Sequence, residues 1–399
     1  MTAGKVLFAA TRDAALSRIA TVEPEDYVRS RNAIEGAVTY LSPYITHGFV
    51  NLQEVLAGVC VRHALHVQHK FVFELGWREY FRHVWQHRGS NIFNSLHQGP
   101  LPDAAYGVVL PEDIRLACTG VPVVDMAIAT LYNTGTLHNH ARMWLASYVV
   151  HVRKVHWRVG ADWLYAHLLD GDLASNHLSW QWVAGTASHK AYLFNADNVA
   201  RHAPLSWHSP GSVIDKSYEE LAHMALQADS AHGSHVSVHR THSLTEPTLY
   251  TQPWADLDLT APDASAVRGR AVWLVHPWSL GLIPIDLPAD VLVIGLFTAD
   301  FHNNWPWNKR RWEFVASRMA DMADLIWYGD ASQIATALQG ASRVRALAEP
   351  HLAPWLSEWA LCEPVPNLFP DLLQRCDSFS KWWHQVSRDQ HALAQRTVN

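Results

Sequence analysis

The sequence predicts a helical domain followed by a small, doubly wound, parallel α/β domain. Three short apolar runs in the second half, AVWLV (271–275), VLVIGLF (291–297) and LIWYG (325–329), have the composition of buried strands. The helical patterns WNKRRWEFVASRMADMA and SQIATALQG follow the second and third runs. Strands that alternate with helices form parallel sheets, whereas the first 204 residues carry helical patterns only.

The length of 399 residues allows two domains, each with its own core. We place the helical domain at 1–204, a connector at 205–268, and the α/β domain with its C-terminal helices at 269–399. The connector is rich in Ser, His, Pro, Asp and Thr, with one short helical pattern at 218–227. Such a composition predicts a segment that is only partly ordered.

Composition indicates a globular protein, with 49% hydrophobic and 17% charged residues. The sequence has no apolar run of membrane-spanning length and no signal-peptide pattern in its first 20 residues. We therefore expect a cytoplasmic protein without membrane contact. Cys60, Cys118, Cys362 and Cys376 are scattered, which favours reduced thiols and predicts no metal centre.

The formal net charge of −6 is unevenly distributed. Residues 1–210 contain 17 Lys and Arg against 16 Asp and Glu (+1), and residues 211–399 contain 14 against 21 (−7). A DNA-binding protein usually presents a basic surface. The first half can still carry a local basic patch, but the balance does not indicate tight DNA binding.

Helical periodicity runs through the chain in order. We expect helices over 11–30, with a turn at Glu23-Pro24, over 67–88, over 120–135 with Gly135 as the C-cap, and over the amphipathic C-terminal stretch 367–386. A further helix is predicted to begin at Ser42-Pro43. The free N–H groups and the dipole at such a start favour phosphate oxygens, and an ordinary Ser-Pro cap is the alternative.

The stretch from Thr136 to Trp182 places charges in strongly apolar and aromatic surroundings. Arg142, Asp170 and Asp172 are the charges concerned. A buried charge is tolerated only when it is paired or bound to a polar ligand, so we expect these residues to face one another or a cofactor. A structural Arg–Asp clamp between two core helices is the alternative.

The motifs of this stretch resemble the flavin-binding helical domain of the photolyase/cryptochrome family, and their sequences are most similar to those of its bacterial branch. The matching residues are His138, Asn139, Arg142, Met143, Trp157, Asp170, Gly171, Asp172, Ala174, Asn176, Trp180, Gln181 and Trp182. The block FELGWREYFRH (73–83) and the stretch from Tyr27 to Gly48 resemble the same family. The α/β domain resembles the family's antenna domain, which that family carries at its N-terminus and this chain carries C-terminally.

The resemblance implies flavin adenine dinucleotide (FAD) as the cofactor. The residues implied to bind it are Tyr27, Thr39, Leu41, Ser42, Arg78, His138, Asn139, Arg142, Asp170, Asp172 and Asn176. Arg142 is expected to pair with Asp170 beside the flavin ring, and Asn176 to face its reactive nitrogen. The sequence does not identify an antenna pigment, because the α/β domain has no glycine-rich phosphate loop.

The resemblance also implies catalytic and substrate-binding residues. Trp180 and Trp157 match the first two stations of an electron relay, and Tyr106 stands near the position of the third. The residues that match a pocket for a flipped-out cyclobutane dimer are Glu74, Trp77, Asn139, Met143 and Trp182. Such a pocket needs apolar and aromatic walls to replace the lost base stacking. Glu74 and Asn176 complete the expected catalytic set.

The implied function is light-driven, FAD-dependent repair of pyrimidine dimers in DNA, with a cyclobutane dimer favoured, as in deoxyribodipyrimidine photo-lyase. Three departures oppose it: Thr136 and His140 replace a usual Trp and Arg, and the Arg after the W-Q-W motif is missing. Lost arginines remove charge-assisted contacts to DNA phosphates. The alternative is a cryptochrome-like photoreceptor or partner-binding flavoprotein whose acidic C-terminal half meets another protein; a dark flavin redox protein is a third.

Overall fold

The computed structural model describes residues 8–228, 243–253, 257 and 259–388. The parts of the predicted connector at 229–242, 254–256 and 258, and residues 389–399 of the predicted α/β domain, lie outside this description. The chain forms two compact units: unit 1 comprises Met1–Val22, Thr39–Tyr80 and Thr248–Asn399, and unit 2 comprises Glu23–Val38 and Phe81–Pro247. Each unit is described separately.

Unit 1 combines a parallel sheet with helices from both ends of the chain. Its strands are β1 (Leu249–Tyr250), β2 (Leu259–Thr260), β3 (Ala271–Val275), β4 (Leu292–Thr298), β5 (Trp307–Asn308), β6 (Leu325–Gly329), β7 (Arg343–Leu347) and β8 (Leu361–Glu363). Its helices are α1 (Arg12–Ala20), α3 (Ser42–Thr46), α4 (Leu52–Cys60), α13 (Ala264–Val267), α14 (Ala299–Asn304), α15 (Lys309–Ala320), α16 (Ala331–Leu338), η5 (Pro350–Leu352), α17 (Ala353–Trp359) and α18 (Phe379–Val386). Helix α5 (Lys70–Arg88) begins in unit 1 and ends in unit 2.

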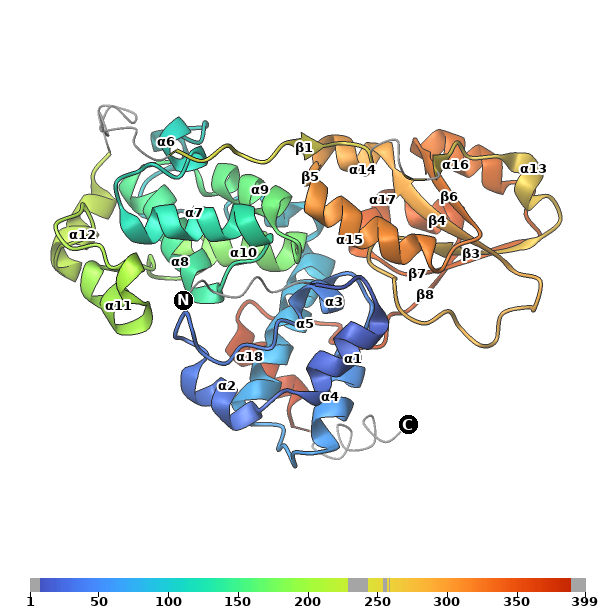
Figure 1. Ribbon diagram of the computed structural model, residues 1–399, viewed down its shortest axis with the longest axis horizontal. Helices are drawn as coiled ribbons and strands as arrows, with labels where there is room; N and C mark the ends of the chain where they lie inside the picture. The colour runs from blue at the N-terminus through green and yellow to red at the C-terminus, as the bar shows by residue number, and fades with distance from the viewer. Residues whose placement is uncertain (1–7, 229–242, 254–256, 258, 389–399) are drawn as a thin grey trace. The chain divides into compact units, whose positions relative to one another are not determined.

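The main sheet has the strand order β2-β6-β4-β3-β7-β8, and all of its neighbouring strands are parallel (Figure 1). From β3 the chain steps to β4 and β6 on one side and then to β7 and β8 on the other, which is a doubly wound topology. Strands β3 and β6 coincide with the predicted runs, and β4 begins one residue later than predicted. All side chains of β4 are buried, as expected for a strand covered on both faces. The predicted fold class is confirmed.

Residues 39–80, which the sequence assigns to the helical domain, pack in the same compact unit as the α/β elements. The Nδ1–H group of His47 donates to the carbonyl of Pro277 at 2.6 Å, and the His47 carbonyl accepts from Leu280 at 3.0 Å. Gly48 has a φ of +69°, and a Cβ there would lie 2.3 Å from the carbonyl oxygen of Trp278. Only glycine fits this close approach. The compact units therefore group the residues differently from the predicted boundaries at 204 and 269.

The prediction of one long C-terminal helix over 367–386 is wrong, because only α18 (Phe379–Val386) is helical. The stretch before it contains Pro370, which cannot donate a helical hydrogen bond. Ser378 then starts α18 by accepting the backbone N–H of Lys381 with its side chain. The helical part is amphipathic as expected, since Trp382, Trp383 and Val386 are buried.

Unit 2 is helical. Its helices are α2 (Pro24–Ser30), α6 (Glu112–Arg115), α7 (Pro122–Thr134), α8 (Asn139–Ser147), α9 (Trp157–His167), α10 (Leu173–Ala184), α11 (Ala196–His202) and α12 (Tyr218–Leu226), with the short turns η1 (Gly89–Phe93), η2 (Asp103–Ala105), η3 (Tyr148–Val152) and η4 (Leu205–Trp207). Helix α7 ends before Gly135, as predicted. A single apolar core joins α7, α8, α9 and α10 and includes Trp144, Trp157 and Trp180.

The described residues of the predicted connector up to Pro247 belong to unit 2, and those from Thr248 onward belong to unit 1. Helix α12 confirms the predicted helical run, and Lys154 Nζ donates to the carbonyls of Met224 and Ala225 at its C-terminal end. Beyond residues 229–242, the carboxylate of Glu246 accepts hydrogen bonds from Trp163 Nε1 (3.0 Å), His167 Nε2 (3.1 Å) and Arg115 Nη1 (3.2 Å). Glu246 therefore fixes this segment to the helical unit.

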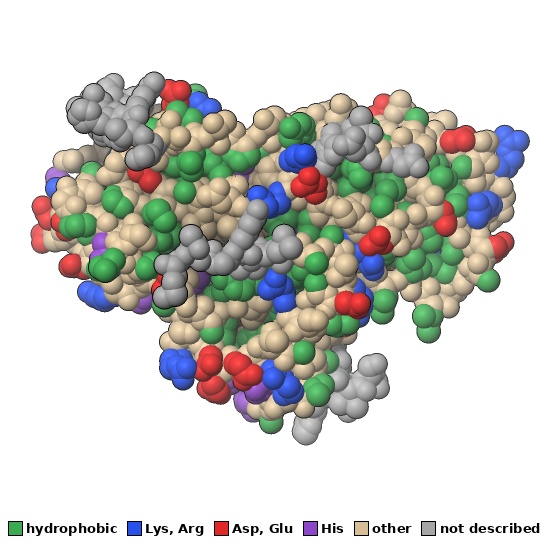
Figure 2. Space-filling model, in the orientation of Figure 1, with side chains coloured by type: hydrophobic (Ala, Val, Ile, Leu, Met, Phe, Trp, Pro, Cys, Tyr) green, Lys and Arg blue, Asp and Glu red, His purple; other side chains and the backbone are tan. Residues whose placement is uncertain are grey.

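Within the described ranges, no helix is both long and apolar enough to cross a bilayer. On the face shown in Figure 2, basic and acidic side chains are interspersed and do not gather in one basic patch. This distribution agrees with the charge balance of the sequence.

Glu246→Ala is expected to lower the free energy of unfolding at neutral pH. The substitution leaves the buried side chains of Trp163 and His167 without their acceptor, at a cost of about 1–3 kcal/mol. The measurement is the urea midpoint, with the exposed Glu35→Ala as the control. Unchanged unfolding of Glu246→Ala contradicts the anchoring role.

The same contact predicts a dependence on pH. Burial opposes ionisation of Glu246, but hydrogen bonds from His167, Arg115 and Trp163 outweigh it and lower its pKa below the ordinary 4.5. A lowered pKa stabilises the fold above the unfolded-state pKa, and this contribution disappears as the pH falls through the folded-state pKa. The stability difference between the parent and Glu246→Ala should therefore shrink in acid.

Candidate functional site

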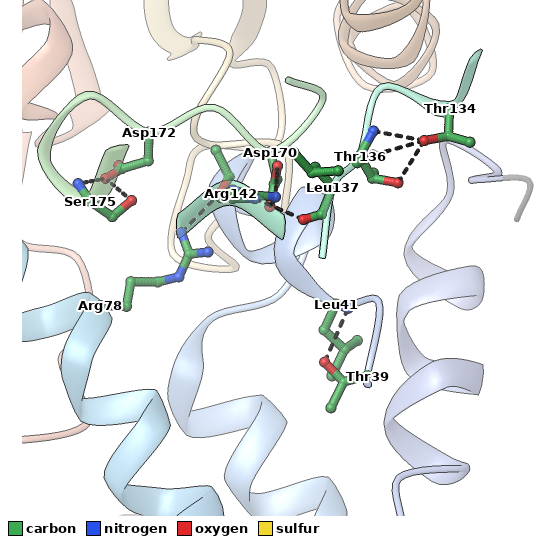
Figure 3. A network of polar contacts seen from close by, with 11 residues as sticks. Thr39, Leu41, Arg78, Thr134, Thr136, Leu137, Arg142, Asp170, Asp172 and Ser175 are labelled. Carbon is green, nitrogen blue, oxygen red and sulfur yellow. Dashed lines mark hydrogen bonds and ion pairs between the residues drawn. The ribbon is translucent and has the colours of Figure 1, made fainter. Parts of the chain in front are cut away.

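The turn Asp170-Gly171-Asp172 joins α9 to α10 and carries two buried carboxylates. Asp172 is the N-cap of α10: its Oδ1 accepts from the backbone N–H and the hydroxyl of Ser175, each at 2.8 Å (Figure 3). Its Oδ2 lies 3.8 Å from Nη2 of Arg82. A carboxylate at the start of a 12-residue helix is stabilised by the helix dipole and by N–H donation.

Arg142 on α8 forms the ion pair with Asp170 that the sequence predicts. Its Nη2 lies 2.8 Å from both carboxylate oxygens, and its Nε donates to the carbonyl of Leu137 at 2.8 Å (Figure 3). The side chain of Asp170 is 6% exposed and that of Arg142 is 26% exposed. The pair is thus closed on the carboxylate side and open to solvent or a ligand on the guanidinium side.

His138 forms the N-cap of α8, beside Arg142. Its Nδ1 accepts the backbone N–H of His140 at 3.1 Å. Burial, together with the neighbouring His140 and Arg142, lowers the pKa of His138 to about 4, so the ring is neutral at neutral pH. Arg142 is therefore the cation that faces Asp170 at this helix start.

Asn176 lies one turn into α10 and is almost fully buried. Its amide Nδ2 donates to the carbonyl of Ala161 on α9 at 2.8 Å. This bond fixes the side chain in one orientation, with the amide oxygen as the group left to accept. Asn139, at the first turn of α8, contacts the sulfur of Met143 at 3.6 Å.

The chemistry of these groups fits a flavin ring. The flavin pyrimidine edge presents one imide N–H donor between two carbonyl acceptors. A carboxylate such as Asp172 accepts the N–H, and a guanidinium such as Arg142 donates to a carbonyl. No metal is needed for this recognition, and the described residues contain no group of three or more His, Cys, Asp and Glu that could hold one.

The two predicted relay tryptophans are buried in unit 2, each 2% exposed. The ring of Trp180 lies directly over Gly160 on α9: a Cβ at Gly160 would be 2.3 Å from Cζ3 of that ring. Trp157 is on the same helix, one turn before Gly160, and its Nε1 donates to Ser95 Oγ at 2.9 Å. Glycine at 160 thus lets the Trp180 ring approach the helix that carries Trp157.

Tyr106 continues this series through His156. The rings of Trp157 and His156 are 5.6 Å apart, and those of His156 and Tyr106 are 6.3 Å apart. Burial raises the pKa of Tyr106, so its phenol stays protonated at neutral pH. His156 also lies 3.5 Å from the half-exposed carboxylate of Asp103, so this end of the series approaches the surface.

The predicted dimer-pocket residues are placed in both units. In unit 1, Glu74 pairs with Lys70 at 2.8 Å, and the ring of Trp77 stacks on Phe379 with centroids 3.9 Å apart. In unit 2, Trp182 is 42% exposed and lies 5.7 Å from the ring of Tyr192, whereas Asn139 and Met143 are neighbours on α8.

The predicted helix start at Ser42-Pro43 is present in the structure. Helix α3 (Ser42–Thr46) begins there, has five residues, and ends at the close approach of Gly48 described above. Thr39 Oγ1 accepts the N–H of Leu41 at 3.3 Å, and Arg78 Nη1 donates to Thr46 Oγ1 at 3.0 Å. The assignments of Thr39, Leu41, Ser42 and Arg78 in unit 1, and of the half-buried Tyr27 in unit 2, to the cofactor stay predictions.

Sequence reasoning did not select several residues that support the site. Ser175 fixes Asp172, and its position three residues after an Asp is the ordinary N-cap pattern that signals it. His177 is buried beside the ring of Trp157, and its Nε2 is 2.8 Å from Asp162 Oδ1. Since α10 is buried nearly all round, no sequence periodicity separates His177 from the core.

Comparison with known proteins identifies the segment that holds this site. Residues 71–267 match the family model of the FAD binding domain of DNA photolyase. A deoxyribodipyrimidine photo-lyase of Synechococcus sp. is 30% identical over 217 residues, which cover 50% of this chain and 43% of that protein. A cryptochrome DASH of Synechocystis sp. is 33% identical over 171 residues, which cover 40% and 34%. The chain thus spans less than half the length of these relatives.

Two solved structures are similar over half of the chain. A cryptochrome of Synechocystis sp. aligns with a TM-score of 0.44 and 28% identity, covering 50% of this chain and 44% of that one. An archaeal photolyase of Sulfolobus tokodaii, whose structure contains two FAD molecules, aligns with a TM-score of 0.43 and 24% identity, covering 50% and 45%.

Arg142→Ala is expected to destabilise unit 2, because Asp170 is then left buried without its cation. An unsatisfied buried group of this kind costs about 1–3 kcal/mol. Urea unfolding checks this, with Arg29→Ala as a matched control. Arg29 also pairs with an aspartate, Asp26, but that pair is exposed and is expected to contribute little. Equal losses in the two variants contradict the clamp.

Proposed function

Residues 71–267 belong to the FAD-binding domain family of DNA photolyase, and from this premise we propose that the protein carries out light-driven, FAD-dependent repair of pyrimidine dimers in DNA. A cyclobutane dimer is the favoured substrate. The observation that supports the proposal most is the buried constellation of Arg142, Asp170 and Asp172, whose donors and acceptors complement a flavin ring.

In this proposal the residues of unit 2 hold and orient the cofactor. Asp172 would accept the imide N–H of the flavin, and Ser175 keeps this carboxylate in place. Arg142 would donate to a ring carbonyl, and Asp170 keeps the guanidinium in its orientation. One N–H of the Asn176 amide is held by the carbonyl of Ala161, so this side chain would offer its amide oxygen or its second N–H to the reactive edge of the ring. FAD, when bound, supplies light absorption and one-electron transfer.

The aromatic series supplies electrons from the protein surface. When FAD is bound, Trp180 would pass one electron to the photoexcited flavin, Trp157 would pass one to Trp180, and Tyr106 would pass one to Trp157 while its phenolic proton goes to solvent. An added thiol in solution would then return one electron and one proton to Tyr106. The order Trp180, Trp157, Tyr106 runs from the buried helix α10 to the end that approaches the surface at Asp103.

The proposed substrate is a flipped-out dimer in damaged DNA. Trp77 in unit 1 and Trp182 in unit 2 each have a flat apolar face of the kind that replaces base stacking, and Met143 and Asn139 in unit 2 have one apolar and one polar group. Glu74 is the acidic group of the set. The reaction is a carbon–carbon bond cleavage of the deoxyribodipyrimidine photo-lyase type.

One observation favours a second candidate, a cryptochrome-like photoreceptor without repair activity. His140 stands where the family has an arginine, and its ring stacks on Trp144 and bonds to the carbonyl of Asn32. Burial lowers the pKa of His140, so it offers no charge to a DNA phosphate at neutral pH. In this candidate the acidic C-terminal half binds another protein.

The purified protein is expected to release FAD on denaturation and, when reduced and illuminated, to remove cyclobutane dimers from an oligonucleotide. Chromatography of the released flavin and of the illuminated oligonucleotide checks both steps. Protein that carries FAD but leaves the dimers intact supports the photoreceptor; protein that takes up no FAD contradicts both candidates.

Trp180→Phe is expected to fold and keep FAD but to photoreduce it far more slowly than the parent under blue light with a thiol. Phenylalanine keeps the aromatic packing over Gly160, but it is much harder to oxidise than tryptophan. Trp157→Phe should show a weaker form of the same defect. Absorbance during illumination is the measurement.

Trp144→Phe is the matched control, since Trp144 is as deeply buried in unit 2 but bonds to Asn198 outside the series. Parent-like photoreduction in both relay variants rejects the proposed order.

A further inference from the structure

The ring of Trp77, a proposed substrate contact, is already stacked in the folded chain. The ring centroids of Trp77 and Phe379 are 3.9 Å apart and the ring planes differ by only 10°. Aromatic side chains usually pack with centroids 4.5–7 Å apart and often edge to face. A close parallel contact is instead the way a nucleobase stacks on an aromatic side chain. Phe379 therefore covers a flat face that a flipped-out base could use.

Helix α18 delivers Phe379 to this position. Phe379 is its first residue, directly after the N-cap Ser378. Its ring is 5% exposed and also meets Phe73 and Tyr80 edge to face, at 4.7 and 5.6 Å. Phe73, Trp77 and Tyr80 recur at helical spacing on α5, so Phe379 lies along one face of that helix.

Separate contacts attach the rest of the C-terminal segment, which we define as residues 367–388, to the same helix. Trp383 Nε1 donates to Gln68 Oε1 at 3.0 Å, and a Cβ at Gly76 would lie 2.7 Å from the ring of Trp383. Glu79 accepts the backbone N–H of Leu368. Because these contacts do not involve Phe379, removing its ring uncovers Trp77 while the C-terminal segment stays attached.

We propose that the C-terminal segment competes with the substrate, with Phe379 occupying the place of a pyrimidine on Trp77 until α18 moves away. The inference rests on the proposed function, because it takes Trp77 as a substrate contact. A dimer that stacks on this face must displace Phe379, and the folded chain therefore binds the lesion more weakly than a chain in which the face is open.

Phe379→Ala tests the proposal on the FAD-loaded protein in the dark. The probe is a labelled oligonucleotide with one cyclobutane thymine dimer. The variant is expected to bind roughly fivefold or more tightly than the parent, a gain of the order that stacking of one base provides. The gain should disappear in the double variant Phe379→Ala/Trp77→Ala. Equal or weaker binding by Phe379→Ala overturns the proposal.

Trp355→Ala is the matched control, because it removes one ring of another parallel pair in unit 1, with Trp359, whose centroids are 6.4 Å apart. Its affinity for the oligonucleotide should equal that of the parent. A gain in affinity as large as that of Phe379→Ala would show that loss of any stacked ring in unit 1 strengthens binding, and it would overturn the proposal.

Hydrogen exchange on the parent protein provides a test that does not depend on the folding of a variant. With saturating dimer-containing oligonucleotide, the amides of α18 should exchange faster than in the free protein. Unchanged or slower exchange overturns the proposal. Failure of the proposed function has a different signature: illuminated parent and Phe379→Ala then both leave the dimers intact, whatever their affinities.

Discussion

The ion pair between Arg142 and Asp170 is the interaction on which the architecture of unit 2 depends. It joins the start of α8 to the turn between α9 and α10, 28 residues further along the chain. A buried carboxylate needs a cation or several donors, so the turn and the first turn of α8 must stay together. Once they do, Asp172 and Ser175 are fixed at the N-terminus of α10, and Asn176 is fixed against Ala161.

The need for a cation opposite the buried Asp170 also explains why His138, next to Arg142 at the start of α8, is neutral. His138 caps α8 next to the guanidinium of Arg142, and its low pKa keeps it from competing for Asp170 as a second cation. A protonated ring there would repel Arg142 in a medium that screens poorly. The region thus combines the carboxylates of Asp170 and Asp172 with the guanidinium groups of Arg142 and Arg82, an arrangement of charged donors and acceptors suited to a polar ring.

Much of this could be predicted from the sequence where the local signal was strong. The apolar runs of β3 and β6 gave correct strand bounds, and Arg142 with Asp170 stood out as charges in an aromatic setting. Strand β7 was missed because its sequence RVRAL carries two arginines, one of which pairs with Glu363 and Asp286. Such pairing depends on residues distant in sequence.

Contacts between residues distant in sequence also explain the other differences between the prediction and the structure. Helix α3 is short because His47 and Gly48, which follow it, pack on residues 277–280. The ring that stacks on Trp77 belongs to Phe379, about 300 positions later in the chain. No periodicity within a local window contains these partners. The grouping of residues 39–80 with the α/β elements was missed for the same reason.

The interleaving of the two units along the chain has a consequence for how the protein folds during synthesis. Unit 2 draws mainly on one stretch, Phe81–Pro247, so its core can close as soon as that stretch has left the ribosome. Unit 1 cannot: His47 binds a carbonyl 230 residues later, and Gln53 binds one 314 residues later. Helices α1, α3 and α4 are therefore synthesised long before the residues on which they pack. Until the α/β elements have left the ribosome, the apolar faces of these helices have no native partner there, and the nascent chain exposes them to chaperones and to aggregation.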